Sequence, residues 1–130
     1  MSITDLPTLL SALTPQLQEG VFAFCVVDDP TGLTPVVTVQ EREGLTVVVP
    51  ELQALEAGIT VLFRAGWITL EVHSDLEAIG LTAAFSTALA GAGISCNVVA
   101  GAFHDHIFVP VADVDRAMDC LRALQSAGAT

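Results

Sequence analysis

Hydrophobic and polar residues alternate strictly over residues 67–73, where the chain reads WITLEVH. A period of two predicts a β-strand. One face of this strand would carry Trp67, Thr69, Glu71 and His73. Ser74 and Glu77 follow as a capping-box pattern, which marks the beginning of a helical segment. The helix expected at 81–92 has an apolar stripe made of Leu81, Ala84, Phe85, Ala88, Leu89 and Ala92.

The rest of the second half predicts a hairpin and a helix. Gly91 and Gly93 end the preceding helix, and residues 95–100 and 106–109 form two apolar runs that we expect to pair. Asp113 is placed to cap the final helix. The apolar side of that helix would carry Val114, Ala117, Met118, Leu121 and Leu124.

The first half predicts shorter elements. Leucines at 6, 9, 10 and 13 indicate a helix that Pro15 and Gly20 would close. Strands are expected at 21–27, 36–39, 45–49 and 59–63, with a short helix at 51–56. We read the order as α-β-β-α-β and then β-α-β-β-α, which is one supersecondary unit used twice. Copy one lacks its first strand, and copy two lacks its last.

This order predicts an α+β fold with helices on one face of antiparallel sheets. The boundary falls near residue 64, which gives halves at 1–64 and 65–130. Residues 63–67 are too few to form a linker, so we expect one compact unit. The missing outer strands suggest that the two halves complete each other, or that a second chain completes them.

Charge narrows the range of partners. Fifteen Asp and Glu against four Arg and no Lys give a net charge of −11, and 52% of the residues are hydrophobic. A hydrophobic chain of this kind is folded rather than disordered. Its negative field repels phosphate, so nucleic acids and anionic membrane surfaces are excluded as favourable partners.

The sequence predicts a cytoplasmic protein, because it shows no pattern of a targeting signal and its cysteines do not form a disulfide or metal-binding pattern. The first residues have no basic segment and no long apolar segment, so no signal peptide is expected. Residues 78–103 are uncharged, but glycines and polar residues interrupt them and no flanking Lys or Arg anchors them, so we expect no membrane span. Cys25, Cys96 and Cys120 show no CxxC pattern and are expected to be free thiols in a reducing compartment.

The sequence His104-Asp105-His106 is the most distinctive chemical motif. Two imidazoles at i and i+2 of a strand point the same way and could meet one metal ion. A metal site needs further ligands, for which the chain offers His73, Asp105 or a distant Glu or Cys. Half-exposed or hydrogen-bonded histidines are the favoured interpretation, with a metal site or a histidine acid–base enzyme as the alternative. No activating pattern surrounds the cysteines, so thiol catalysis is disfavoured.

A second candidate site lies around the helix at 81–92. Asn97 is an amide in an otherwise apolar strand, where it would satisfy backbone groups or bind a polar ligand. The first N–H groups of a helix attract an anion, and Gly80 would let a ligand approach the backbone. A carboxylate held there, with an ammonium held by Asp105 or a carbonyl group, would make a site for a free amino acid. The alternative is that water or the Ser74/Glu77 cap fills this role.

Residues 67–111 resemble the ACT domain family, whose pattern is matched at Gly80, Leu89, Gly93, Ile94 and Val98. The sequence also resembles a subgroup of small stand-alone ACT proteins in three segments: FCVV, EREGLTVVV and HDHIFVP. The resemblance therefore covers nearly the whole chain. Residues 75–80, which read DLEAIG, depart from the Asp-x-Pro-Gly common in this loop.

The resemblance implies two intertwined ferredoxin-like βαββαβ units that bind amino acids at interfaces between ACT units. It implies a non-catalytic regulatory or sensor module without a cofactor, acting through a partner or as a homodimer. The alternatives are an assembly module without a ligand and a metal-binding protein that uses His104 and His106. The matching positions, together with Asp105, give the expected ligand-binding set: Ile79, Gly80, Leu81, Thr82, Asn97, Val98 and Asp105.

Overall fold

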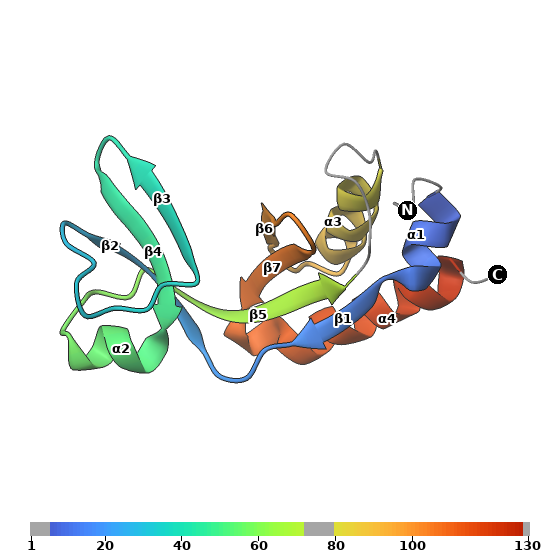
Figure 1. Ribbon diagram of the computed structural model, residues 1–130. Helices are drawn as coiled ribbons and strands as arrows, with labels where there is room; N and C mark the ends of the chain where they lie inside the picture. The colour runs from blue at the N-terminus through green and yellow to red at the C-terminus, as the bar shows by residue number, and fades with distance from the viewer. Residues whose placement is uncertain (1–5, 72–79, 129–130) are drawn as a thin grey trace. The chain divides into compact units, whose positions relative to one another are not determined.

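The computed structural model describes residues 6–71 and 80–128 (Figure 1). The predicted capping box and the predicted residues His73 and Ile79 lie outside the described residues. Contacts divide the chain into two compact units. We call Glu19–Gly66 the inserted unit. Met1–Gln18 and Trp67–Thr130 together form the composite unit, so residues 6–18 pack with the C-terminal part of the chain rather than with the first half.

The composite unit has a four-stranded sheet covered by helices. Its sheet order is β1-β5-β7-β6, with β5 contributing from Trp67 onward. This arrangement confirms the predicted α+β fold with helices on a sheet. The elements are α1 (Leu6–Ala12), β1 (Thr14–Leu17), β5 (Phe63–Glu71), α3 (Leu81–Gly91), β6 (Asn97–Ala100), β7 (Asp105–Pro110), a 3-10 turn (Val111–Asp113) and α4 (Val114–Gly128).

Strand β1 corrects the sequence-based expectation for residues 14–20. We expected Pro15 only to end a helix, yet Thr14–Leu17 pairs antiparallel with β5, from Thr14 opposite Glu71 to Leu17 opposite Ile68. Proline is tolerated at a sheet edge because a strand there has one side without ladder hydrogen bonds. Since β1 pairs with β5 on the side away from β7, it supplies the outer strand that the second copy seemed to lack.

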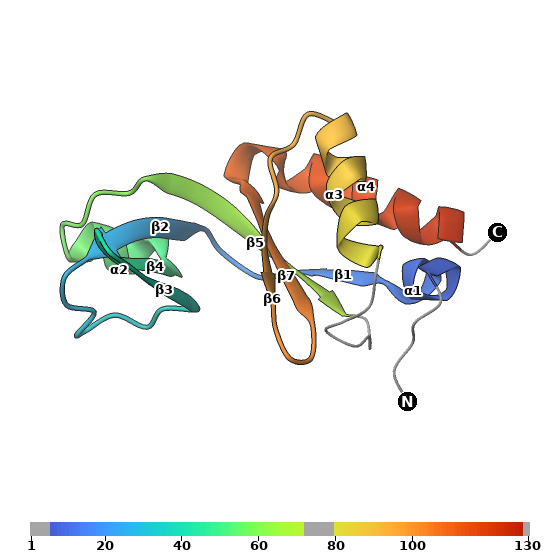
Figure 2. The same cartoon turned by 90° about the horizontal axis from the view of Figure 1, so that it is seen from above.

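One apolar core joins the helices to the composite sheet. Helix α1 lies against the C-terminal end of α4 in both Figure 1 and Figure 2, and Gln125 Nε2 donates to the Ser11 carbonyl over 3.3 Å. Within the core, Leu9 and Leu13 are fully buried, which makes the N-terminal segment part of this unit. The buried core residues are Leu9, Leu13, Ile68, Leu70, Leu81, Phe85, Leu89, Ile94, Ile107, Val109, Ala117, Met118 and Leu121.

The inserted unit is a smaller antiparallel sheet with a single described helix. Its sheet order is β3-β4-β2-β5, and Phe63–Gly66 of β5 forms its last strand. Helix α2 covers one face, over a core that includes Ala23, Cys25 and Val47. Residues 28–36 between β2 and β3 contain no helix. The elements are β2 (Phe22–Val27), β3 (Val37–Glu41), β4 (Gly44–Pro50) and α2 (Glu51–Glu56).

Strand β5 also differs from the prediction. The sequence indicated separate strands at 59–63 and 67–73, whereas the structure has one strand over Phe63–Glu71. Phe63 to Ala65 continue the ladder because they pair with Phe22 to Phe24 of β2. Ile59 and Val61 instead pack against the core of the inserted unit as irregular chain.

No helix among the described residues is long and apolar enough to cross a membrane.

The N-terminal segment yields the first prediction. Leu13→Ala leaves a cavity in the composite core, so we expect the free energy of unfolding to fall by about 2–5 kcal/mol. Leu17→Ala is the matched control, because Leu17 is 46% exposed and its truncation should change stability by about 0.5 kcal/mol or less. Urea unfolding followed by circular dichroism measures both, and equal losses in the two variants would contradict this packing.

Candidate functional site

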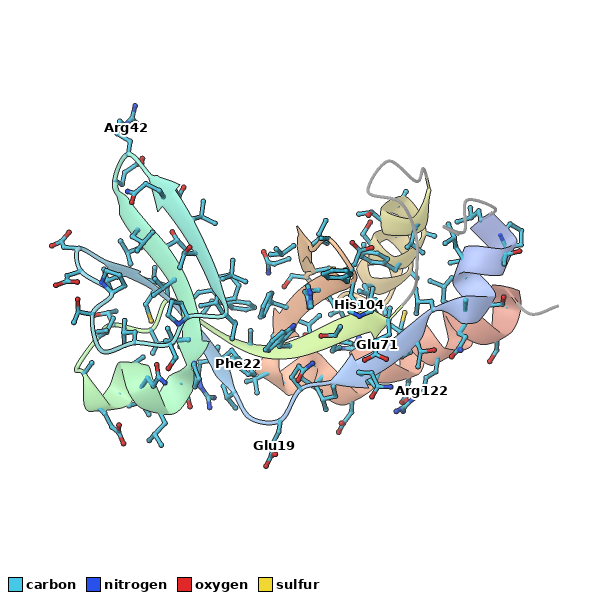
Figure 3. The ribbon with its side chains drawn as sticks, viewed as in Figure 1. Glu19, Phe22, Arg42, Glu71, His104 and Arg122 are labelled. Atoms are coloured by element: carbon cyan, nitrogen blue, oxygen red, sulfur yellow. The ribbon has the colours of Figure 1, made fainter. Side chains whose placement is uncertain are left out.

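The histidine motif lies at the turn between β6 and β7, where Figure 3 labels His104. Asp105 begins β7, and successive side chains of a strand point to opposite faces. His106 therefore shares a sheet face with Phe108, while Asp105 shares the helix-covered face with Ile107. Among residues 6–71 and 80–128, no three His, Cys, Asp or Glu side chains gather as a metal site would require.

His106 is held by two neighbours on β5. Its Nδ1 lies 3.1 Å from the Trp67 indole nitrogen and 3.1 Å from the Thr69 hydroxyl. An indole N–H can only donate, so Nδ1 accepts this hydrogen bond and the neutral ring carries its proton on Nε2. Burial, helped by the nearby His104, lowers the pKa of His106, although Asp105 opposes this shift. The geometry and the electrostatics both favour neutral His106.

Thr69 extends this arrangement to the N-terminal segment. Thr69 is only 5% exposed, and its hydroxyl accepts a 3.0 Å hydrogen bond from Gln18 Nε2. The Gln18 backbone N–H also donates to the Trp67 carbonyl over 2.9 Å. Because Gln18 fills the acceptor side of the hydroxyl, Thr69 can donate its proton to His106 Nδ1, whose single lone pair it shares with the Trp67 indole N–H. We call Gln18, Thr69, Trp67 and His106 the polar cluster.

The Trp67 ring also contacts the rings of His106 and Phe108 on the same face of the sheet. Its centroid lies 6.0 Å from that of Phe108 at an interplanar angle of 23°, and 5.7 Å from that of His106. Such ring contacts add stability beyond area burial. The lone pair of His106 Nδ1 is already engaged, so the cluster has the chemistry of a structural network rather than of a general base. Sequence alternation had placed Trp67 and Thr69 on one face, but nothing in the sequence pointed to Gln18.

Asp105 differs from the hydrogen-bonded side chains of the polar cluster. It is half-buried, and among the described residues its carboxylate makes no hydrogen bond or ion pair. Burial raises its pKa, and the nearby His106 only partly offsets that effect. A perturbed pKa without a structural partner is typical of groups that bind or react. A carboxylate in this state is suited to accept a cation such as an ammonium group.

The predicted residues at the start of α3 have mixed roles. Gly80 adopts a φ of 98°, which favours glycine, and the Ala84 N–H donates to its carbonyl over 2.9 Å. A Cβ at Gly80 would lie 3.4 Å from Leu6 Cδ2. The side chain of Leu6 on α1 therefore lies beside Gly80 at ordinary contact distance, and the positive φ is what favours glycine here. Leu81 is buried in the core, and Thr82 is exposed.

Asn97 and Val98 lie at the beginning of β6. We expected a buried amide, but Asn97 is exposed, and its Nδ2 donates to the Phe108 carbonyl over 3.3 Å. Val98 is 36% exposed. Only a short turn separates the end of α3 from Asn97, and the eleven residues of α3 span about 16 Å. Asn97 and Gly80 therefore belong to opposite ends of this helix.

The inserted unit has a surface hollow that the sequence did not indicate. Its volume is about 480 Å³. The Asp29 carboxylate accepts hydrogen bonds from the Thr31 N–H and hydroxyl, which lower its pKa, and Gln53 bonds to Thr34. These polar groups are thus used to shape the loop. The lining residues are Asp29, Thr31, Gly32, Leu33, Gln53, Glu56, Ala57 and Ile59.

The polar cluster predicts how stability depends on pH. The pKa of His106 is lower in the folded chain, so the stability provided by its neutral form is complete above about 6.5 and is lost as the pH falls through the folded pKa. His106→Gln removes this titration and should lower stability at neutral pH by about 1–3 kcal/mol. Urea unfolding at neutral pH and at about pH 5, followed by fluorescence of Trp67, the single tryptophan, measures both effects.

His104→Gln is the comparison variant. It removes a charge that lowers the pKa of His106, so the folded pKa should lie closer to the unfolded value, and the acid-induced loss should be smaller and end at a higher pH. Identical pH dependence in the wild type and in His106→Gln would show that the cluster does not require a neutral His106.

Comparison with known proteins identifies both parts of the chain. The ACT domain family matches residues 1–66, and a second pattern, also described as ACT domain, matches residues 62–123. A solved Vibrio cholerae protein of unknown function, described as a possible transport protein, is 43% identical. That match covers 92% of this chain and 95% of the other, with a TM-score of 0.85. No curated protein matches the sequence.

More distant structures share the fold. An Agrobacterium tumefaciens protein is 14% identical over 87% of this chain and 89% of its own, with a TM-score of 0.66. The ligand-free regulatory subunit of aspartate kinase from Thermus thermophilus is 12% identical, and the match covers 87% of this chain and 97% of the other, with a TM-score of 0.67. The resemblance seen in the sequence is thus confirmed over the whole fold. The chain belongs to the ACT domain family, a class of regulatory, ligand-binding domains, and consists of two ACT units.

Proposed function

We propose that this protein is a non-catalytic regulatory module that binds a small molecule, most simply a free amino acid, at an interface between ACT units. The family match to both units carries the proposal. The fold shared with a regulatory subunit of aspartate kinase supports a regulatory rather than a catalytic role. Three free thiols support a reducing compartment, so we propose a cytoplasmic location.

The geometry of α3 supports an interface site between two copies. Gly80 and Asn97 lie at opposite ends of a helix about 16 Å long, which is much longer than a free amino acid. One ligand that contacts both positions would therefore need Thr82 and Gly80 from one ACT unit and Asn97 and Val98 from another. A homodimer in which two composite units meet would satisfy this requirement.

The proposed chemistry uses two kinds of group. The first N–H groups of a helix have no intrahelical acceptors, so the beginning of α3 would receive the ligand carboxylate. Asp105 would receive the ammonium, since its half-buried carboxylate has no ion-pair partner among the described residues. A cation beside Asp105 also favours its ionised form and so opposes the effect of burial on its pKa.

An assembly module without a ligand is the second candidate. It is favoured by the exposed valines Val26 and Val39 on the sheet of the inserted unit. The metal-binding alternative has less support, because Trp67 and Thr69 occupy His106 Nδ1 and only Nε2 would be left for a metal.

A thermal-shift screen with the twenty amino acids tests the proposed function. A ligand at a hundred times its Kd stabilises the folded state by about 2.7 kcal/mol, which raises Tm by several degrees. We expect one amino acid, or a few of similar structure, to produce this shift. A flat panel would contradict the proposal.

Asp105→Asn then tests the ammonium site. The raised pKa means that the charge of Asp105 costs stability once the pH exceeds the folded pKa, so the unliganded variant should have an equal or higher Tm at neutral pH. Its ligand-induced shift should nevertheless be lost. Asp119→Asn is the matched control, because it removes the same charge from an exposed position on α4 and should keep the shift. An intact shift in Asp105→Asn would exclude this residue from the site.

A further inference from the structure

Helix α2 of the inserted unit directs two leucines toward solvent. Its buried residue is Ala54, which packs in the core of the inserted unit. Leu52 and Leu55 lie elsewhere around the helix and are 64% and 61% exposed. Residues three apart on a helix are neighbours, so the two leucines form one apolar ridge. A surface helix usually directs its leucines into the core, and here that arrangement is reversed.

A third leucine extends this ridge toward β5. Leu62 is 65% exposed and belongs to the segment that returns along α2. At one end of this segment the Ile59 N–H donates to a carbonyl of α2 over 2.9 Å. At the other end Arg64 Nη2 donates to Glu51 Oε1 over 3.1 Å. Leu55 follows Glu51 by one turn on the same side of the helix, so Leu55 and Leu62 are neighbours there.

We call Leu52, Leu55 and Leu62 the leucine surface. A contiguous exposed apolar surface of this kind marks an interaction site, whereas single exposed leucines do not.

The surface hollow of the inserted unit adjoins the leucine surface. Glu56 links the two, because it lines the hollow and follows Leu52 by one turn on the outer side of α2. Asp29, on the loop between β2 and β3, lines the hollow as well. The described lining residues include these two carboxylates and no cationic side chain. The leucine surface thus passes directly into an acidic hollow.

Both carboxylates of the hollow retain binding capacity. The Thr31 N–H and hydroxyl both donate to Asp29 Oδ1, and these hydrogen bonds lower the pKa of Asp29, so that it is ionised at neutral pH. Within the described part of the chain, no hydrogen bond reaches Asp29 Oδ2 and no cation pairs with Glu56. The hollow is therefore suited to a cationic group.

We propose that the leucine surface and the acidic hollow together bind a basic amphipathic helix of a partner protein. Apolar side chains of that helix pack against the leucines, because the side-chain ridges of one helix fit the grooves of another. A lysine or arginine side chain of the same helix reaches into the hollow, where its charge meets Asp29 and Glu56. Leu33 and Ile59 also line the hollow, which suits the apolar stem of such a side chain.

Charge distinguishes this partner from other occupants of the leucine surface. A second copy brings another net charge of −11 and only four arginines, of which Arg42, Arg64 and Arg116 already pair with carboxylates of their own chain. An anionic lipid surface is repelled for the same reason. A basic partner is instead attracted over a long range, and its cations are complementary to the carboxylates of the hollow.

This contact is independent of the proposed amino-acid site. The leucine surface and the hollow lie in the inserted unit, whereas Gly80, Asn97 and Asp105 belong to the composite unit. Variants of the two sites can therefore be made and measured separately. Loss of one property leaves the other testable.

Fluorescence anisotropy of the full chain with a fluorescein-labelled peptide tests the contact. The probe is a leucine–lysine peptide patterned as an amphipathic helix, and a scrambled peptide of the same composition lacks the apolar face. We expect the patterned peptide to bind with a Kd that rises at least about tenfold in Leu55→Gln, because the variant loses apolar contact. Glutamine and leucine have similar helix propensities, and circular dichroism verifies that the variant is folded.

Matched variants separate this contact from general attraction between opposite charges. Leu17→Gln makes the same change at an exposed leucine of the composite unit and should leave the Kd unchanged. Glu56→Gln should raise the Kd by about two- to fivefold, since it removes one carboxylate from the hollow. Glu71→Gln removes the same charge from an exposed position in the composite unit and should have a smaller effect.

Several results would overturn the proposal: no binding of the patterned peptide, equal binding of the scrambled peptide, an unchanged Kd in Leu55→Gln, or equal weakening by Leu17→Gln. Two further measurements examine the other occupants. Sedimentation velocity detects a dimer, and pelleting with phosphatidylcholine vesicles detects membrane binding. A dimer or a vesicle complex that Leu55→Gln abolishes would assign the leucine surface to that occupant and so contradict the proposal.

Discussion

Pairing between β1 and β5 is the contact on which the composite unit depends. Thr14–Leu17 closes one edge of the sheet against Ile68–Glu71 and ties the N-terminal segment to the C-terminal part of the chain. Without it, α1 would have no fixed position against α4, and Leu9 and Leu13 would leave the core. The same pairing brings Gln18 beside Thr69. A long-range strand contact therefore determines both the packing of this unit and the polar cluster on its sheet.

In the polar cluster, hydrogen bonds offset the free-energy cost of burying polar groups. Thr69 is nearly inaccessible, yet Gln18 and His106 satisfy its hydroxyl on both sides. A buried polar group left without partners would cost about 1–3 kcal/mol, and each engaged neighbour removes part of that cost. Because His106 Nδ1 accepts hydrogen bonds from Trp67 and Thr69, this nitrogen has a structural role. Asp105, one residue earlier and on the opposite face of β7, is the group with unused binding capacity.

The sequence predicted the helices and strands whose formation depends on the local pattern of apolar and polar residues. The alternation at 67–71 and the stripe at 81–91 correspond to a strand and a helix in the structure. Strand β1 was missed because Thr14-Pro15-Gln16-Leu17 is short and carries a proline, so its strand identity comes only from distant β5. Likewise, Gln18 bonds a residue 51 positions away, and Leu6 occupies the space beside Gly80. Asn97 was expected to be buried because its neighbours in sequence are apolar, but β6 is an edge strand of the described sheet.

The two units differ in the groups that they place around their sheets. The inserted unit has a loop at residues 28–36 between its strands β2 and β3, whereas the composite unit has α3 between β5 and β6, and the helix of the inserted unit, α2, begins with the acidic Glu51. The composite unit also carries Asp105, while its sheet face is occupied by the polar cluster. Among the described residues, the carboxylate of Asp105 without an ion-pair partner and the polar cluster thus belong to the composite unit, whereas the exposed Val26 and Val39 belong to the inserted unit.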